Sequence, residues 1–442
     1  MSKSVDSAEK KPPQSQRMIK WYLHYLRSCG FYPLADLLTG QSFSRLYLPY
    51  SCIIVVVSAL FAAVDLLVWI AVQYRAIIRL EFFSMVMLLD RVFFTIHAPF
   101  AYIYMILQSK RIQHLVASLD RTTAKNRGAK IFAVLSIIWT EICPALSLIM
   151  TIRMTQEFVE LLHRDTVWNH MDSFSLRVVS ILNIVGNVVL GHANIAPHAF
   201  IATVVVIITI MFRRIHGQLR VVQRVGDQVD VEEKHAKLAD AMTGFRKTVR
   251  VLREFNEIFG GLVLYSCVKD LLVIVAFIAF NLNLPVERED GEDTVEYLIR
   301  KEGTHGSTAA YAYYGGATGI FMVVVRLAVF IGCSAQVRRI SKTLEAIGDE
   351  HPDSPLDTLC MRFQQEIASS ENVAVSAGGF FSVTKEYLIT VTGAILSYFI
   401  LIYQTRDQKI DMADLVKENV FKKEMDYMLR NITNLVYKLK RR

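Results

Sequence analysis

Long uninterrupted apolar runs dominate the pattern of hydrophobic and polar positions along this chain. A run of about 18 or more residues with few charges is long enough to cross a bilayer as a helix. Seven candidate spans are present, at residues 46–73, 82–107, 131–153, 176–212, 257–281, 309–333 and 387–404. The fourth run is too long for one crossing, so we expect its helix to extend beyond the membrane. The pattern predicts an all-α membrane protein with seven transmembrane helices.

The composition agrees with a protein that is embedded in a lipid bilayer. The 442 residues are 53% hydrophobic and 20% charged, and the mean hydropathy is +0.33. A soluble protein of this length rarely has such values. Residues 1–20 are polar and lack the apolar core of a signal peptide, so we expect the first span to act as the targeting signal. None of the six cysteines lies in a predicted outer loop, so no disulfide framework is expected.

The distribution of Lys and Arg predicts the orientation of the chain in the membrane. About 27 of these residues lie in segments 1–45, 108–130, 213–256 and 334–375, against about 6 in segments 74–81, 154–175 and 282–308. Because positive charge accumulates on the cytosolic side, the N-terminus is expected in the cytosol, and seven spans then place the C-terminus outside. The net charge of +8 therefore reflects the flanks of the spans, and we expect no nucleic-acid partner.

Between the spans, the spacing of apolar residues predicts further helices. In segment 213–256 apolar positions recur every three or four residues among many charges, which is typical of amphipathic helices that continue out of spans four and five. Segment 334–386 shows the same pattern. Solvated single helices would explain this, but isolated amphipathic helices are marginal in water, so we favour one cytosolic bundle. Loop 282–308 is acidic, and would be either a solvated loop or a concentrator of cations near a pore.

The last span carries small and polar residues near one face. Ser397, Leu401, Gln404 and Thr405 lie close to one another at helical spacing. A helix that faces lipid has no need of this stripe, whereas a helix that lines a pore does. Around such a pore, copies of Leu401 would form an apolar ring that blocks ions by dewetting, and Gln404 would offer carbonyl oxygens to a hydrated cation. The alternative is that these positions pack against neighbouring spans.

A motif in this span resembles the C-terminal signature of the insect chemoreceptor superfamily, and within it of a gustatory receptor. The signature is Thr-Tyr, five apolar residues, then Gln-Phe. Tyr398 and Gln404 match it, whereas Ser397 and Thr405 replace its Thr and its Phe. The stretch that precedes this motif, with Gly378 and Gly379, also matches the style of the family, and we expect these two glycines to have a structural role.

The resemblance implies a homotetrameric, ligand-gated, nonselective cation channel in the plasma membrane. A small-molecule ligand, a sugar or another tastant, would bind among spans two to six, and cations would pass between four copies of the last span. The expected organisation is a cytosolic N-terminal arm (1–45), spans one to four (46–212), cytosolic helical extensions (213–256), spans five and six with the acidic outer loop (257–333), cytosolic anchor helices (334–386), a pore-lining span (387–404) and an amphipathic tail (405–442).

The tail continues beyond the point where such receptors usually end. Its apolar residues are spaced four and three apart, at Phe421, Met425, Met428, Ile432, Leu435 and Leu439. This short heptad seam predicts either association of four tails or a helix lying on the membrane. The sequence Asn431-Ile432-Thr433 is a glycosylation acceptor, which agrees with an exported tail.

Ionisable residues inside spans are functional candidates by default, because burying charge in lipid is costly. Asp90, Arg91 and Glu141 are candidate ligand-binding residues, with structural ion pairs between spans as the alternative. Ion pairing is the preferred interpretation for a second set of buried charges, Lys269, Asp270 and Arg326. Tyr311 and Tyr314 begin span six, where they would form an interfacial aromatic belt or face the ligand pocket.

Two other functions are compatible with many spans. A secondary transporter would use buried charges as a coupling relay, but inverted repeats and paired broken helices are not visible. A G-protein-coupled receptor would have the opposite orientation, and Asp90-Arg91-Val92 lies inside span two. The chain has no phosphate-binding loop, His-Glu-x-x-His, Cys-x-x-Cys or nucleophile elbow, so we expect no enzyme activity, cofactor or metal.

Overall fold

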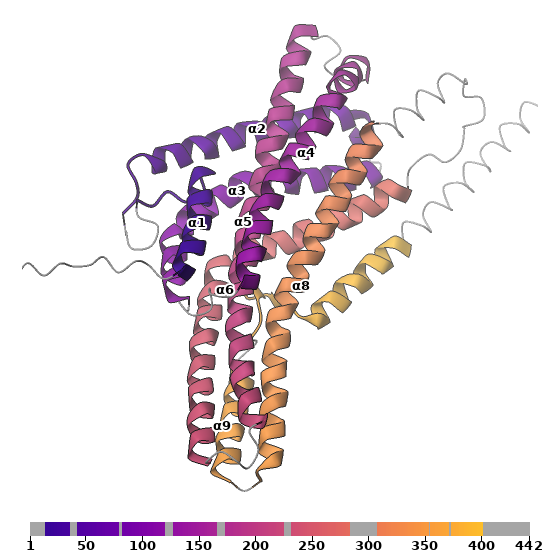
Figure 1. Cartoon of the computed structure of the whole chain (residues 1–442). Helices are drawn as coiled ribbons and strands as arrows, with labels where there is room; N and C mark the ends of the chain where they lie inside the picture. Colours follow the sequence, from indigo (N-terminus) through magenta and orange to yellow (C-terminus); the bar gives the residue numbers. More distant parts are fainter. Residues whose placement is uncertain are drawn as a thin grey trace, which may run out of the picture.

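The chain folds into long helices with one small β-hairpin (Figure 1). The computed structural model describes residues 14–35, 42–78, 82–119, 127–165, 173–224, 231–282, 307–352, 354–370 and 373–400. The helices are α1 (Gln14–Ser28), α2 (Tyr47–Ile78), α3 (Phe82–Ser118), α4 (Arg127–Asp165), α5 (Ser173–Arg224), α6 (Val231–Leu282), α8 (Ser307–Glu350) and α9 (Pro355–Ser369). Strands β1 (Ser376–Ala377) and β2 (Phe381–Ser382) form the hairpin, and a further helix, here called the final helix, covers 385–400.

Six helices in the described ranges are long and apolar enough to cross a membrane. Their apolar segments are Tyr47–Leu67, Leu88–Ser118, Arg127–Leu146, Ile184–Arg224, Val231–Ile278 and Gly319–Glu350. They coincide with the first six predicted spans. The predicted seventh span begins in the final helix, but residues 401–442 lie outside the described residues. The seventh crossing, the orientation and the tail therefore stay predictions.

The lower halves of α5, α6 and α8 pack with α9 into one helical bundle, which we call the lower bundle (Figure 1). Helices α5 and α6 run without a break from their apolar segments into this bundle, as the spacing of their apolar residues predicted. The ring of Phe245 in α6 lies 5.8 Å from that of Phe212 in α5 and 5.3 Å from that of Phe363 in α9. Helix α9 begins where Ser354 Oγ accepts a hydrogen bond from the Asp357 N–H, at 3.2 Å. Buried aromatic packing thus holds the bundle together.

The N-terminal arm contains a helix that docks into the core. Tyr22, Leu23 and Leu26 lie on one face of α1 and are fully buried. After the turn at Gly30, whose φ of 84° favours glycine, Phe31 stacks on Tyr102 of α3 with ring centroids 4.0 Å apart. The sequence predicts this region only as an arm, because a helix of 15 residues is too short to form a membrane span.

The final helix is connected to the lower bundle through the β-hairpin, which packs on α6. Asn256 of α6 makes two hydrogen bonds to the backbone where the first strand begins. Its Nδ2 donates to the Ala374 carbonyl at 2.9 Å, and its Oδ1 accepts from the Ser376 N–H at 2.9 Å. Gly378 and Gly379 form the turn with φ of 62° and 80°, a conformation that other residues rarely adopt. These glycines therefore allow the tight turn that fixes the direction in which the final helix leaves the hairpin.

Candidate functional site

The final helix stands away from the rest of the chain (Figure 1). One narrow face is half-buried, at Tyr387, Val391, Ile395 and Tyr398. The other faces are exposed, and Ile389 has 72% of its surface accessible. Most of this helix is therefore without neighbours among the described residues.

An exposed face of the final helix carries a line of small and polar residues, which we call the polar stripe. It consists of Glu386, Thr390, Gly393 and Ser397, spaced four, three and four residues apart, so the four share one helical face. All four are exposed. The sequence analysis named only Ser397 of these. Its other pore-lining candidates, Leu401, Gln404 and Thr405, lie outside the described residues.

The lower end of the final helix is held to α8 and to the hairpin. Arg338 of α8 donates through Nη2 to Glu386 Oε1 at 2.6 Å. This hydrogen bond, with a further one from Thr384, lowers the pKa of the Glu386 carboxyl to about 2, so the group is ionised at neutral pH. The ring of Tyr387 stacks on that of Phe381 in β2 at a centroid distance of 4.7 Å. Both contacts fix where the helix starts.

Arg91, one of the ligand-binding candidates, forms an ion pair between two apolar helices. Its guanidinium donates from Nε to Asp65 Oδ2 of α2 at 2.7 Å and from Nη2 to Asp65 Oδ1. Thr95 donates to the same carboxylate at 2.8 Å. The pair joins α2 to α3. Asp65, which the sequence analysis did not single out, was detectable as a lone carboxylate within the first apolar run.

Asp90, the neighbour of Arg91, has a different environment. Its side chain is half-buried, and Oδ1 is a buried atom for which the described residues provide no hydrogen-bond partner. An unsatisfied buried acceptor is costly unless something else supplies a donor. Among the candidate ligand-binding residues whose side chains are described, Asp90 therefore has an acceptor oxygen that could still receive a hydrogen bond from a ligand.

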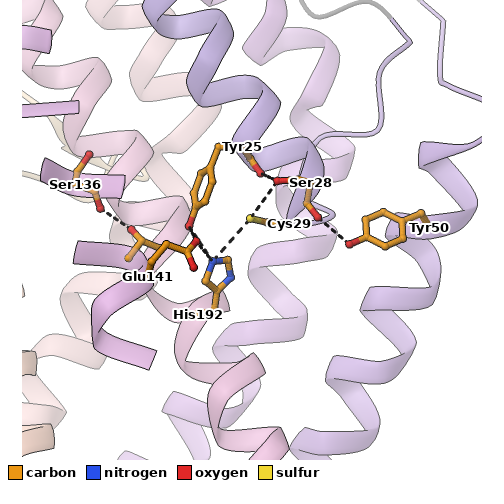
Figure 2. Close-up of polar contacts among 8 residues, drawn as sticks. Tyr25, Ser28, Cys29, Tyr50, Ser136, Glu141 and His192 are labelled. Carbon is orange, nitrogen blue, oxygen red and sulfur yellow. Dashed lines mark hydrogen bonds and ion pairs between the residues drawn. The ribbon is translucent and has the colours of Figure 1, made fainter. Parts of the chain in front are cut away.

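Glu141 belongs to a separate polar cluster, at the junction of α1, α4 and α5 (Figure 2). Tyr25 donates its hydroxyl to Glu141 Oε1 at 2.7 Å and lies 2.9 Å from His192 Nε2. Burial raises the pKa of Tyr25, so the hydroxyl keeps its proton. The Glu141 side chain is nevertheless 59% exposed. Tyr25 is 116 positions from Glu141 and 167 positions from His192 in the sequence, so the spacing of residues does not reveal this cluster.

A third polar cluster lies among α3, α5 and α6. His97 Nε2 is 2.9 Å from His198 Nε2, and His198 Nδ1 is 3.0 Å from Ser266 Oγ. His97 Nδ1 is buried without a hydrogen-bond partner among the described residues. Lys269 donates to Asn194 Oδ1 at 3.0 Å, although the sequence analysis placed it among structural ion pairs. These contacts cross-link three helices inside the apolar region.

Asp270 and Arg326, which were expected to take part in structural ion pairs, pair with each other and join α6 to α8. Tyr311 and Tyr314 belong to α8 by their backbone, but their side chains lie outside the described part of the structure. Within the described residues, no group of three or more His, Cys, Asp or Glu side chains is arranged to hold a metal ion.

The chain matches a family model in sequence and solved structures in fold. The family model described as 7tm Chemosensory receptor matches residues 19–409. No curated protein sequence matches the chain. The fold is similar to that of the insect olfactory receptor OR5 from Machilis hrabei in complex with eugenol, with a TM-score of 0.64 and 11% identity, over 89% of this chain and 99% of that one.

A second structure of OR5 from Machilis hrabei matches with a TM-score of 0.60 and 12% identity, over 88% of this chain and 98% of that one. At these identities the likeness shows a shared fold. Together with the family match, it confirms the resemblance to the insect chemoreceptor superfamily that the last span indicated. Because the family model covers most of its length, the chain belongs to the 7tm chemosensory receptor family.

Proposed function

We propose that this protein is a ligand-gated, nonselective cation channel of the gustatory-receptor type, opened by a small-molecule tastant. It works as a homotetramer in the plasma membrane, with its N-terminus in the cytosol. The observation that carries this proposal is the final helix, which exposes the polar stripe of its own subunit and continues into the signature containing Gln404. A receptor function without catalysis agrees with the family.

A pore at the common axis of four subunits accounts for the exposed stripe. Polar groups that face lipid are unfavourable, whereas groups that face a water-filled pore are hydrated. Ser397 and Gln404 are seven residues apart, so a continuing helix places them on the same face. Leu401 lies between them and would form the dewetting gate, with Thr405 at a wider outer end.

The ligand site is proposed among the apolar helices, and Asp90 is its best-supported member. Its unused Oδ1 would accept a hydrogen bond from a ligand hydroxyl. Arg91 and Glu141 already have protein partners, so a ligand that reached them would compete with Asp65 and Tyr25. Tyr311 and Tyr314 are proposed to contact the ligand through their aromatic rings. The related olfactory receptor structure holds eugenol, a small organic molecule, which agrees with a ligand of that size.

Patch-clamp recording from cells that lack other chemoreceptors tests the proposal. A panel of sugars and bitter compounds is first screened by calcium imaging, and active compounds are then applied to excised patches. We expect unitary current steps carried by both Na⁺ and K⁺ without added G protein. A current that needs a coupled ion gradient and shows no unitary steps would indicate a transporter, and a response that needs a G protein would indicate a coupled receptor.

The Asp90→Asn variant tests the ligand site within the same recordings. This change keeps an acceptor oxygen but removes the charge, so we expect the ligand concentration for half-activation to rise about tenfold, as for loss of one charged hydrogen bond. Ser58→Ala serves as a control in α2, because Ser58 donates only to a carbonyl one turn earlier. An unchanged half-activation concentration in Asp90→Asn would exclude Asp90 from the site.

A further inference from the structure

Glu386 is the charged member of the polar stripe. It lies at the lower end of the final helix, one residue before the predicted seventh span, and shares a helical face with Ser397. Its side chain is 63% exposed although it is paired with Arg338. Thr390, the next stripe member, donates its hydroxyl to the Glu386 carbonyl one turn earlier, at 3.0 Å.

Arg338 approaches this position from another apolar helix. It lies five residues after the predicted end of span six, so the predicted topology places both charges at the inner membrane surface. The pair is short, at 2.6 Å, and both side chains are more than half exposed. Lys385 is adjacent to Glu386 in sequence but lies about 100° around the helix, off the polar stripe.

We propose that the Arg338–Glu386 pair balances the charge at the inner mouth of the pore, so that loss of either member alone changes the preference of the pore between cations and anions. This inference rests on the proposed channel function. In a tetramer, four pairs surround the axis, and each contributes one positive and one negative charge. Neutralising one member would leave four like charges around the mouth, which would change the local concentrations of cations and anions.

The two single neutralisations should therefore act in opposite directions. Glu386→Gln leaves four guanidinium groups, so we expect the permeability of K⁺ relative to Cl⁻ to fall about sevenfold, because a local potential of about one kT lowers the cation concentration and raises the anion concentration about 2.7-fold each. Arg338→Gln leaves four carboxylates and should raise the ratio by about the same factor. The double variant removes both charges and should return close to the wild-type ratio. Arg362→Gln, at an exposed arginine of α9 in the lower bundle, is the control and should leave the ratio unchanged.

Reversal potentials in excised patches under a steep KCl gradient measure this ratio. Opposite shifts in the single variants with recovery in the double variant would support the proposal. If the variants change only the ligand concentration for half-activation and leave the reversal potential unchanged, the pair is a mechanical tie between α8 and the final helix, and the proposal is wrong. Absence of any unitary current from the wild-type chain would instead contradict the proposed function.

A chemical modification separates the charge effect from folding. Glu386→Cys channels are assembled first and then treated from the cytosolic side with charged methanethiosulfonate reagents. A negatively charged adduct should restore the K⁺ preference, and a positively charged adduct should lower it further. The wild-type chain receives the same treatment, because Cys52 is exposed and sets the background. Equal effects of both reagents would overturn the proposal.

Discussion

Gly260 of α6 and Gly378 of the hairpin bring two backbones into direct contact. A Cβ atom on Gly260 would lie 2.9 Å from the backbone nitrogen of Gly378 and 3.1 Å from its Cα, and backbone atoms cannot rotate away as a side chain does. The Gly260→Ala substitution should therefore push the hairpin off α6 and destabilise the fold by about 1–3 kcal/mol. The midpoint of thermal unfolding of purified protein, followed by size-exclusion chromatography, measures this loss.

Gly332→Ala in α8 is the control for this substitution. Nothing lies within 4 Å of a Cβ at Gly332, so the change should be neutral or slightly stabilising, because Ala favours a helix more than Gly does. If both variants unfolded at the same temperature, the close approach between α6 and the hairpin would not constrain the fold.

At the scale of elements, the lower bundle depends on aromatic side chains that sequence spacing could identify. Phe363 of α9 is fully buried against Phe245 of α6. Phe363→Ala should cost about 3–5 kcal/mol and release α9, since a cavity remains where the ring was. Limited proteolysis should then cut near α9 faster than in the wild type. Met361, in the same helix but 50% exposed, provides the control, and Met361→Ala should leave the cutting rate unchanged.

The elements that the sequence predicted well are those whose signal is local. Apolar length identified the first six spans, and the three-to-four spacing identified the extensions of α5 and α6. Helix α1 carries the same three-to-four spacing, at Ile19, Tyr22, Leu23 and Leu26, but over only 15 residues, and the spacing alone does not show that this face packs on helices far along the chain. A docking helix of this kind is recognised only when its tertiary partners are known.

The candidate site shows the same limit. The stripe on the last span follows from helical spacing, so Ser397 could be named from the sequence. The partner of Arg91 could not, because Asp65 lies 26 positions away on a different helix. Arg338 and Glu386, 48 positions apart, were likewise invisible as a pair. The packing of the helices, rather than the local sequence pattern, decides which charged side chains pair with each other.

At the scale of the whole molecule, most of the final helix lacks neighbours among the described residues. One face is half-buried, and the polar stripe lies on another, exposed face. Lipid would be a poor environment for the stripe, so other copies of the chain are the expected neighbours. Four chains around one axis would give particles of four times the 50.3 kDa of one chain.

Cross-linking through the stripe tests this arrangement directly. In a ring of four, Ser397→Cys thiols face the axis and one another, so a flexible bis-maleimide should join subunits into dimers and higher species on a denaturing gel. Val391→Cys lies on the half-buried face toward its own subunit and should give far less product. The wild-type chain again shows the background from Cys52.

Equal yields from Ser397→Cys and Val391→Cys, or particles with the mass of one subunit, would mean that the stripe does not face a common axis. The helix would then require a partner other than further copies of this chain.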